Sequence, residues 1–203
     1  MKLVVTMFTS IDGVAQAPGG PKEDTDGGFD QGGWVVPHFD DATGEAVGGW
    51  FATADAFLLG RKTYEMFAGY WPHAPEEEEP VRSKLNELPK YVASRGEPDL
   101  AWNNSRPIDG ELTEAVGKLK EQPGRDLQVH GSPTMAQHLL GAGLVDELRV
   151  LTFPVVLGKG KRLFEPGTKP SAWTLESVAR TPSGVQAQVY RFQGAPTHGT
   201  YGF

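Results

Sequence analysis

The sequence predicts an α/β fold in which a mixed central sheet is flanked by helices and edged by antiparallel strands. Apolar runs typical of buried strands alternate with segments of helical period over most of the chain, and the C-terminal part contains two strands around a Pro-Ser-Gly turn. The 203 residues, of which 38% are hydrophobic, are enough for one hydrophobic core. Since no internal repeat divides the chain, we expect a single domain over residues 1–203.

The N-terminal part contains the first strand, a long loop and the first helix. Residues 2–8 are apolar and β-branched and end before an Asp-Gly turn, which is typical of a buried strand. Residues 16–33 include six Gly and two Pro, so we expect a long loop of the kind that is usually functional or mobile. From Pro37 to Ala54 apolar residues recur every three or four positions, which predicts a helix capped by Asp40 or Asp41.

The middle of the chain alternates short strands with short helices. The apolar pattern predicts a strand at 56–59, a helix at 63–68 and a strand at 90–93. Between the helix and the second strand, residues 72–80 contain two prolines at their ends and four consecutive Glu, which indicates a solvated loop.

Two further helices flank a strand at 127–129. Asp109 is the expected cap of the first helix, whose apolar residues Leu112, Val116 and Leu119 share one face. Ser132 is the expected cap of the second, with Pro at the first helical position. Its buried side is expected to consist of Met135, Leu139 and Leu140.

The C-terminal part supplies the antiparallel edge. Residues 145–157 form a long strand region, and 173–181 pairs with 185–192 in a hairpin whose second arm alternates apolar with polar residues. An apolar strand such as 148–157 is hazardous when it is exposed at a sheet edge, so either the rest of the monomer or a second copy of the chain must cover it. We predict that a second copy covers it in a homodimer.

Composition excludes several classes of function. The 19 Lys and Arg against 26 Asp and Glu give a net charge of −7, which argues against nucleic acid or an acidic membrane and favours a small-molecule partner. The chain has no Cys, and its five His show no paired ligand spacing, so we expect neither disulfides nor a metal site. The N-terminus carries no long apolar run, which indicates a cytoplasmic protein.

Three segments suit the binding of phosphate. Residues 58–65, 92–95 and 129–134 are apolar runs that stop at Gly or Ser; the first and last lead into predicted helices, and the first two carry Arg at the break. Helix N-termini leave backbone N–H groups unpaired and carry a partial positive charge, which favours anions. Because Arg follows the end of two of these apolar runs, we expect a ligand with more than one phosphate.

Four motifs carry a resemblance to a known family. They are Thr9-Ser10-Ile11-Asp12-Gly13, the segment 59–65, the segment 91–95, and Gly131-Ser132 followed by 143–148. In this order they resemble the dihydrofolate-reductase-like superfamily, in particular its riboflavin-biosynthesis reductase branch, the RibD C-terminal domain-like proteins. The resemblance covers nearly the whole chain. It implies a mostly parallel sheet of about eight strands with a C-terminal antiparallel hairpin, and an NADPH-dependent reductase.

The resemblance also implies roles for the phosphate-binding segments. Thr63 and the backbone N–H groups around it face the pyrophosphate of the cofactor, and Arg61 faces the 2′-phosphate, which a guanidinium binds bidentately. Ser94 and Arg95 match the loop that closes over the same 2′-phosphate.

Further cofactor contacts are implied on the central strands. Gly131 and Ser132 match a Gly-Gly pair that often carries a cis peptide bond beside the pyrophosphate, with Ser here in place of the second Gly. Residues 14–16 and the end of the first strand border the nicotinamide. We interpret His130 as a packed or hydrogen-bonded residue rather than an acid or base. The predicted cofactor-binding residues are Met7, Phe8, Ala15, Gly60, Arg61, Lys62, Thr63, Ser94, Arg95, Gly131, Ser132, Thr134 and Met135.

The substrate half departs from the folate reductases. Those enzymes carry a Trp, a Pro three residues later and a carboxylate two residues further; Trp34 and Pro37 match, but Phe39 occupies the position of the carboxylate. Asp40 and Asp41 are displaced by one and two positions, a rotation of about 100° and 200° on a helix. We predict one of these two aspartates as the catalytic proton source or substrate anchor. Trp34 and Phe39 are predicted substrate contacts, with core packing as the alternative.

These observations favour a reductase that orients NADPH against a pteridine- or pyrimidine-like heterocycle, with hydride supplied by the cofactor. The alternative is a nucleotide-binding or sensing module of the same fold without turnover, which the missing carboxylate would explain. A purely structural dimerisation domain is disfavoured by the cationic strand ends.

Overall fold

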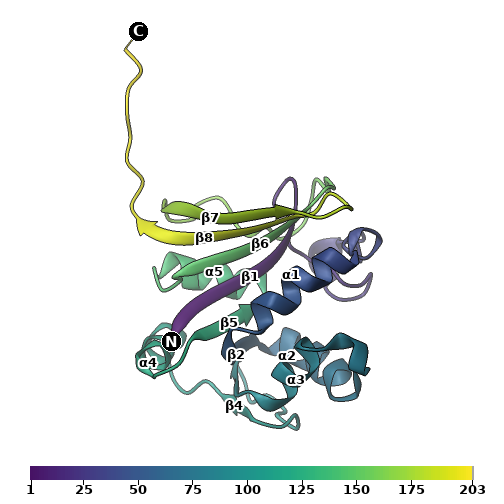
Figure 1. Cartoon of the computed structure of the whole chain (residues 1–203). Helices are drawn as coiled ribbons and strands as arrows, with labels where there is room; N and C mark the ends of the chain where they lie inside the picture. The colour runs from purple at the N-terminus through teal and green to yellow at the C-terminus, as the bar shows by residue number, and fades with distance from the viewer. Residues whose placement is uncertain (203) are drawn as a thin grey trace.

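A sheet of eight strands runs through the molecule, in the order β4-β3-β2-β5-β1-β6-β8-β7 (Figure 1). The computed structural model describes residues 1–202. Strands β1 to β6 pair in parallel, and β8 runs antiparallel between β6 and β7. The predicted fold class, with its C-terminal hairpin, is confirmed. The strands are β1 (Lys2–Ser10), β2 (Ala54–Gly60), β3 (Lys90–Ala93), β4 (Ser105–Pro107), β5 (Asp126–His130), β6 (Glu147–Phe153), β7 (Ala172–Arg180) and β8 (Gln186–Gly194).

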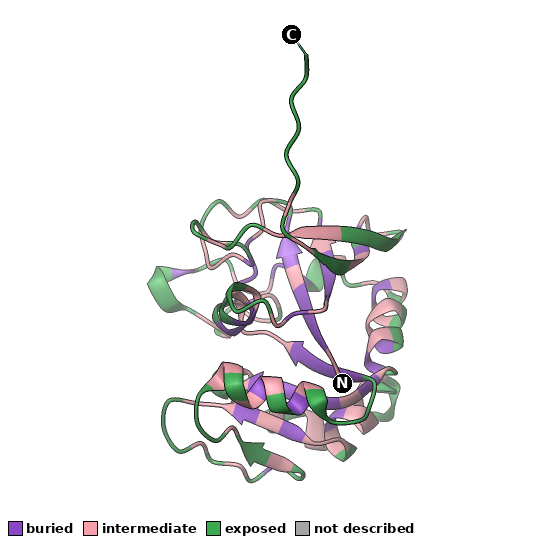
Figure 2. Cartoon of the chain, turned by 90° about the vertical axis from the view of Figure 1, so that its left-hand side faces the viewer, coloured by how far each residue is buried: buried purple, intermediate pink, exposed green. Residues whose placement is uncertain are grey.

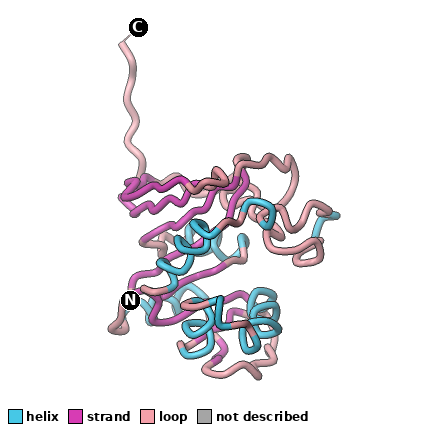
Figure 3. The backbone as a smooth tube through the Cα atoms, turned by 45° about the vertical axis from the view of Figure 1, so that its right-hand side comes forward, coloured by secondary structure: helices cyan, strands magenta, loops and turns pink. Residues whose placement is uncertain are grey.

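Helices cover both faces of the sheet (Figure 3). On one face, α1, α2 and α3 pack over two apolar clusters, and on the other α4 and α5 enclose a third cluster with β1, β2 and β5. The central strands are therefore buried on both sides (Figure 2). The helices are α1 (Asp41–Phe51), α2 (Arg61–Tyr70), α3 (Val81–Glu87), α4 (Leu112–Glu121) and α5 (Pro133–Gly141).

The helix caps differ in part from those expected. Asp40 caps α1 by accepting a hydrogen bond from Thr43 N, and Ser132 caps α5, both as predicted. Helix α4 begins later than expected, and its cap is Glu111 rather than Asp109. The side chain of Glu111 accepts from Glu114 N, three residues on, which is the geometry of a capping side chain.

The strand region at 145–157, which was expected at a sheet edge and covered by a second copy, lies inside the sheet, which is a correction. Strand β6 pairs with β1 on one side and β8 on the other, and its apolar residues are buried within the monomer. The open edge on this side is β7, most of whose side chains are exposed, including Leu175 and Val178.

Polar contacts fix the long loop between β1 and α1. The side chain of Gln16 donates to the carbonyls of Asp24 and Asp26, and its amide oxygen accepts from Lys161 N. Lys161 Nζ in turn lies 2.5 Å from the Asp24 carboxylate and 2.8 Å from that of Asp26. This loop therefore has a defined conformation at the C-terminal end of β1.

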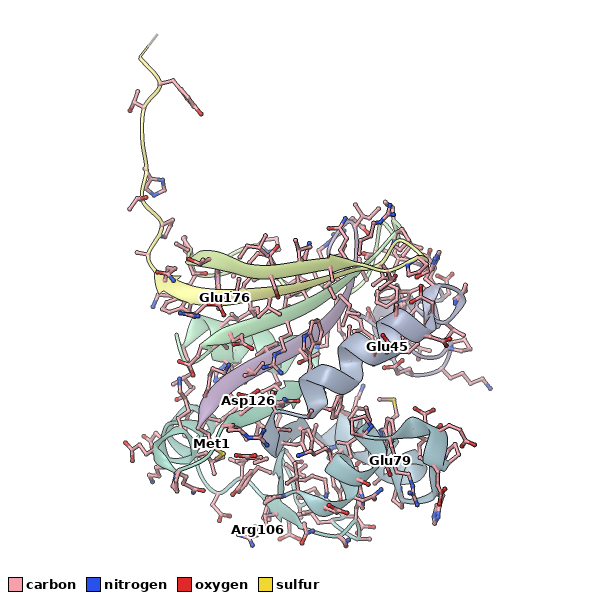
Figure 4. The ribbon with its side chains drawn as sticks, in the orientation of Figure 1. Met1, Glu45, Glu79, Arg106, Asp126 and Glu176 are labelled. Atoms are coloured by element: carbon pink, nitrogen blue, oxygen red, sulfur yellow. The ribbon has the colours of Figure 1, made fainter. Side chains whose placement is uncertain are left out.

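A network of charges is buried between the sheet and the C-terminal end of α1, where Figure 4 labels Asp126. Arg149 Nη2 lies 2.8 Å from Asp126 Oδ2, and Arg149 Nε lies 2.7 Å from Glu147 Oε1. All three residues are at most 5% exposed. Thr53 Oγ1 donates to Asp126, and Lys2 Nζ reaches Glu147 at 2.5 Å. The charges balance, with two cations facing two carboxylates.

Candidate active-site cleft

A cleft of about 2000 Å³ opens at the C-terminal ends of β1, β2, β3 and β5. In open α/β sheets this is where ligands bind. A pocket for one small molecule typically has about 300–1,000 Å³, so the cleft has room for two ligands side by side. It is lined by every predicted cofactor-binding residue and by Phe39, Asp40 and Asp41.

The starts of α2 and α5 meet in this cleft. Gly60 precedes α2 without any side-chain cap, so the first N–H groups of the helix are left for a ligand. A Cβ placed on Gly60 would lie 3.6 Å from Ser132 Oγ, and one on Gly131 would lie 3.5 Å from Thr63 Oγ1. Gly131 has a φ of +66°, and the Gly131-Ser132 peptide bond is cis. Two helix N-termini thus converge with little side-chain bulk between them.

Cationic side chains line the cleft together with the N-termini of α2 and α5. Arg61 lies 2.9 Å from Glu65, one turn along α2, and Lys62 lies 3.1 Å from Asp26 of the long loop. Both pairs are largely exposed, and such pairs contribute little to stability. Arg95 has no ion pair with any of residues 1–202. These cations are therefore available to a phosphorylated ligand at small cost.

The two candidate aspartates differ in their environments. Asp40 Oδ1 accepts from Thr43 N and Oγ1, and its Oδ2 accepts from Ser183 N. The hydrogen bonds from Thr43, together with those from Ser183, outweigh desolvation and hold the pKa of Asp40 well below its ordinary value. Asp40 is therefore the cap of α1, and its lowered pKa disfavours it as a proton source; its role as a substrate anchor remains a prediction. Asp41 lines the cleft and remains a prediction.

The two predicted substrate contacts, Trp34 and Phe39, also differ in their positions. Trp34 is buried in the core, with its ring edge-on to Phe153 and its Nε1 donating to Gln16 O, and it does not line the cleft. This burial favours the packing alternative, and a role as a substrate contact remains a prediction. Phe39 is 44% exposed, lines the cleft and lies 6.4 Å from the ring of Phe8. Its role as a substrate contact remains a prediction.

Glu23 is a cleft carboxylate that sequence reasoning missed. It belongs to the long loop and accepts hydrogen bonds from Gly19 N and Gly20 N. Burial raises the pKa of Glu23, and these hydrogen bonds offset the rise only in part. No periodicity marks this residue, because its position depends on the path of the loop.

His130 ends β5 and lines the inner part of the cleft. Its ring stacks on Phe51 of α1, with centroids 4.2 Å apart, and its Nε2 lies 2.9 Å from Gln128 Oε1. Burial, together with the positive charge of Arg149, lowers the pKa of His130 to about 3. The ring is thus packed and hydrogen-bonded, as interpreted from the sequence, and it is neutral.

Among residues 1–202 there is no group of three or more His, Cys, Asp or Glu side chains placed to hold a metal ion. Over the same residues, no helix has the length and apolar character needed to cross a membrane.

Comparisons with known proteins find matches over most of the chain. Residues 1–187 match the family model described as the RibD C-terminal domain. YyaP of Bacillus subtilis (strain 168), an uncharacterized protein, is 32% identical over 142 residues, which cover 69% of this chain and 75% of YyaP. YwjB of the same organism, also uncharacterized, is 26% identical over 194 residues, which cover 94% of this chain and 98% of YwjB.

Solved structures share the fold. A candidate riboflavin biosynthesis protein from Shewanella sp. PV-4 superposes with a TM-score of 0.66 at 17% identity, covering 95% of this chain and 99% of its own. A pyrimidine reductase-like protein from Corynebacterium diphtheriae superposes with a TM-score of 0.64 at 16% identity, covering 95% and 92%. At such identities the likeness establishes the architecture only.

Proposed function

The chain belongs to the RibD C-terminal domain family, and on that premise we propose that it is an NADPH-dependent reductase acting on a pteridine- or pyrimidine-like heterocycle. The observation that carries the proposal is a large cleft whose lining includes both the starts of α2 and α5 and the aromatic residues Phe8, Phe39 and Phe51. The name of the pyrimidine reductase-like structure supports a reductase. The other solved neighbour, named for riboflavin biosynthesis, supports a place in riboflavin metabolism.

The residues at the phosphate end fit a dinucleotide. Thr63, Gly131 and Ser132 surround the uncapped start of α2, where backbone N–H groups suit a pyrophosphate. Arg61 and Arg95 line the same cleft and suit a 2′-phosphate. Bound there, the nicotinamide would supply the hydride for reduction.

The other end of the cleft would receive the substrate. Phe8, Phe39 and Phe51 line it and offer aromatic surface for a flat ring. With Asp40 committed to capping α1, Asp41 and Glu23 are the carboxyl groups proposed to hold or move a proton. The raised pKa of Glu23 favours its protonated form more than usual.

Replacing Arg61 by Ala is expected to weaken NADPH binding about tenfold or more and NADH binding little. The reason is that a charge-assisted hydrogen bond to the 2′-phosphate is worth about 1.5–3 kcal/mol, and NADH lacks that phosphate. Fluorescence titration with both cofactors measures the difference. Arg106→Ala is the matched control, since Arg106 lies exposed on β4 and outside the cleft (Figure 4).

Equal losses for NADPH and NADH would contradict the assignment of Arg61. The same protein is then assayed for NADPH oxidation with dihydropteridines, dihydrofolate and pyrimidines of the riboflavin pathway. Tight binding without turnover on any of them would favour the alternative, a sensing module. The observation behind that alternative is that Phe39 replaces the expected carboxylate while Asp40 serves as a cap.

We also propose a homodimer, now through the hairpin of β7 and β8 rather than through β6. Leu175 and Val178 expose 47% and 55% of their surface on the open edge strand, and Phe192 of β8 exposes 38%. A second copy covering them would remove apolar surface from water. Light scattering at micromolar concentration is expected to give twice the 22.0 kDa of one chain. A monomer mass that stays unchanged on tenfold concentration would contradict the dimer.

A further inference from the structure

A second pocket lies between α2, α3 and the segment 101–103, which leads from β3 to β4. Its volume is about 590 Å³, within the range of about 300–1,000 Å³ that holds one small molecule. Figure 1 shows α2 and α3 together over this edge of the sheet. None of the described residues that line this pocket also lines the cleft. The proposed reductase site therefore assigns no role to it.

Trp102 supplies a fixed aromatic ring to this pocket. It is 6% exposed, its Nε1 donates to Asn86 Oδ1 at 2.9 Å, and its backbone N donates to the hydroxyl of Tyr64 at 3.1 Å. Because the indole N–H is already paired, the ring offers the pocket only apolar surface, next to Ala68 and Pro72. Such a wall suits a flat, apolar ring.

A buried cation lies against the same ring. Lys90 is fully buried, and its Nζ lies 4.4 Å from the centroid of the Trp102 ring. It donates to the carbonyls of Leu85 and Leu88 and has no ion pair with any described residue. Burial lowers the pKa of Lys90 to about 8, so most of it is still protonated at neutral pH. Its unbalanced charge favours an anion over a cation on the pocket side of the ring.

Arg82 brings a second cation into the pocket lining. Its Nη1 lies 3.3 Å from Glu79 Oε1, but both side chains are more than a third exposed, so this pair contributes little to stability. Its Nε is buried and has no hydrogen-bond partner among residues 1–202. Such atoms are rare in folded proteins and require an explanation. Together, Nε and Nη2 form the edge of a guanidinium that holds a carboxylate through two parallel hydrogen bonds.

The neighbouring carboxylates limit the charge of a ligand. Glu79 accepts from Ser83 Oγ at 2.7 Å and from Ser83 N at 3.2 Å, so it keeps these partners when Arg82 binds a ligand. Glu87 also lines the pocket; it is exposed and has no ion pair within the described part of the chain. Because solvent screens Glu87, it repels a single negative charge weakly and a double charge more strongly. The lining therefore favours a monocarboxylate over a phosphate dianion.

We infer that this pocket is a second ligand site, which binds an aromatic monocarboxylate. The carboxylate accepts from Nε and Nη2 of Arg82, and the aromatic ring lies against Trp102. Lys90 contributes its positive charge from behind that ring. The inference goes beyond the proposed function, because the site shares no described lining residue with the cleft.

The test uses probes that separate charge from ring. Calorimetry with the full chain measures the binding of 2-naphthoate, its neutral amide 2-naphthamide, the dianion 2-naphthyl phosphate, and acetate. We expect 2-naphthoate to bind most tightly. The amide should bind about tenfold more weakly, because it lacks the charge that strengthens both hydrogen bonds. Acetate should not bind at millimolar concentration, because it has no ring to place against Trp102.

The site variant is Arg82→Met, which keeps the apolar stem and removes the guanidinium. It should weaken 2-naphthoate binding about tenfold or more and abolish the preference over the amide. Its unfolding temperature should be equal or higher, because the unpaired Nε is gone. The matched control is Arg106→Met, since Arg106 is exposed on β4 and lines neither the pocket nor the cleft. Glu87→Gln should tighten binding about twofold by removing a repulsion.

A further variant, Arg61→Met, decides where the probe binds. Unchanged binding of 2-naphthoate supports the second pocket, whereas its loss would place the probe in the cleft and overturn the inference. The inference is also overturned if Arg82→Met binds 2-naphthoate like wild type, if another probe binds as tightly, or if 2-naphthoate does not bind at millimolar concentration. NADPH titration is run in parallel. Binding of 2-naphthoate through Arg82 in a protein that does not bind NADPH would support this site and contradict the reductase.

Discussion

Replacing Arg149 by Met is expected to lower the free energy of unfolding by about 3–5 kcal/mol, as for other buried ion pairs that lose one partner. Arg149 lies between two buried carboxylates, those of Asp126 and Glu147, and it also donates to Trp50 O at 3.0 Å. Without it, Lys2, whose side chain is 40% exposed, is the cation left within ion-pair distance of the two carboxylates among residues 1–202. Urea unfolding of wild type and variant measures the loss.

The matched control is Arg191→Met, the same substitution on the neighbouring strand β8. Arg191 pairs with Glu176 at the surface, with 63% of its side chain exposed, so its loss should cost less than about 1 kcal/mol. Similar costs for the two variants would show that the buried network does not contribute as its geometry indicates. Both substitutions remove an Arg that pairs with carboxylates, one buried between two of them and one exposed with a single partner.

Most strands could be predicted because each is an apolar run ended by Gly, Pro or polar residues. The strand expected at 90–93 has those bounds in the structure, and the hairpin arms differ from prediction by one or two residues. What could not be predicted is which strands lie at the edge. A fully apolar pattern is the same for a central strand and a covered edge strand, and β6 becomes central only because β8, distant in sequence, pairs with it.

Two elements were missed because their sequences carry little apolar pattern. Helix α3 has one fully buried residue, Leu85, within a stretch that contains Arg82, Ser83, Lys84 and Asn86. Its position is set by packing on the sheet rather than by propensity. Strand β4 has three residues and ends in Pro107, which is tolerated there because β4 is the outermost strand.

The candidate site also has one part that could be predicted from the sequence and one part that could not. Its phosphate end could be predicted because glycine-ended strands followed by helix starts are local features, and Gly60 and Gly131 do come together. Its substrate end could not, because it depends on contacts across the sheet. Thr6 and His130 both line the cleft but are far apart in sequence, and they become neighbours only through the register of β1 and β5. Trp34 fitted a motif locally, but the fold uses it for packing.

The pH dependence of stability provides a direct test of the environment of His130. The folded state lowers the pKa of His130 from 6.5 to about 3, so between these values the unfolded chain binds a proton that the folded chain does not. The free energy of unfolding should therefore fall as the pH falls below 6.5, with a slope that approaches about 1.4 kcal/mol per pH unit. Above pH 6.5 His130 contributes no slope.

Between pH 6 and 5, the comparison of wild type with His130→Phe isolates this contribution, because Glu23, whose pKa burial raises, contributes equally to both proteins. The carboxylates with lowered pKa values, among them Asp12 and Glu111, start from ordinary values of 3.8 and 4.5, so the stability that they contribute is lost only at lower pH. Urea unfolding at several pH values in this window is expected to give a steep slope for wild type and a shallower one for His130→Phe, which cannot be protonated. Parallel slopes for the two proteins would contradict a buried, neutral His130.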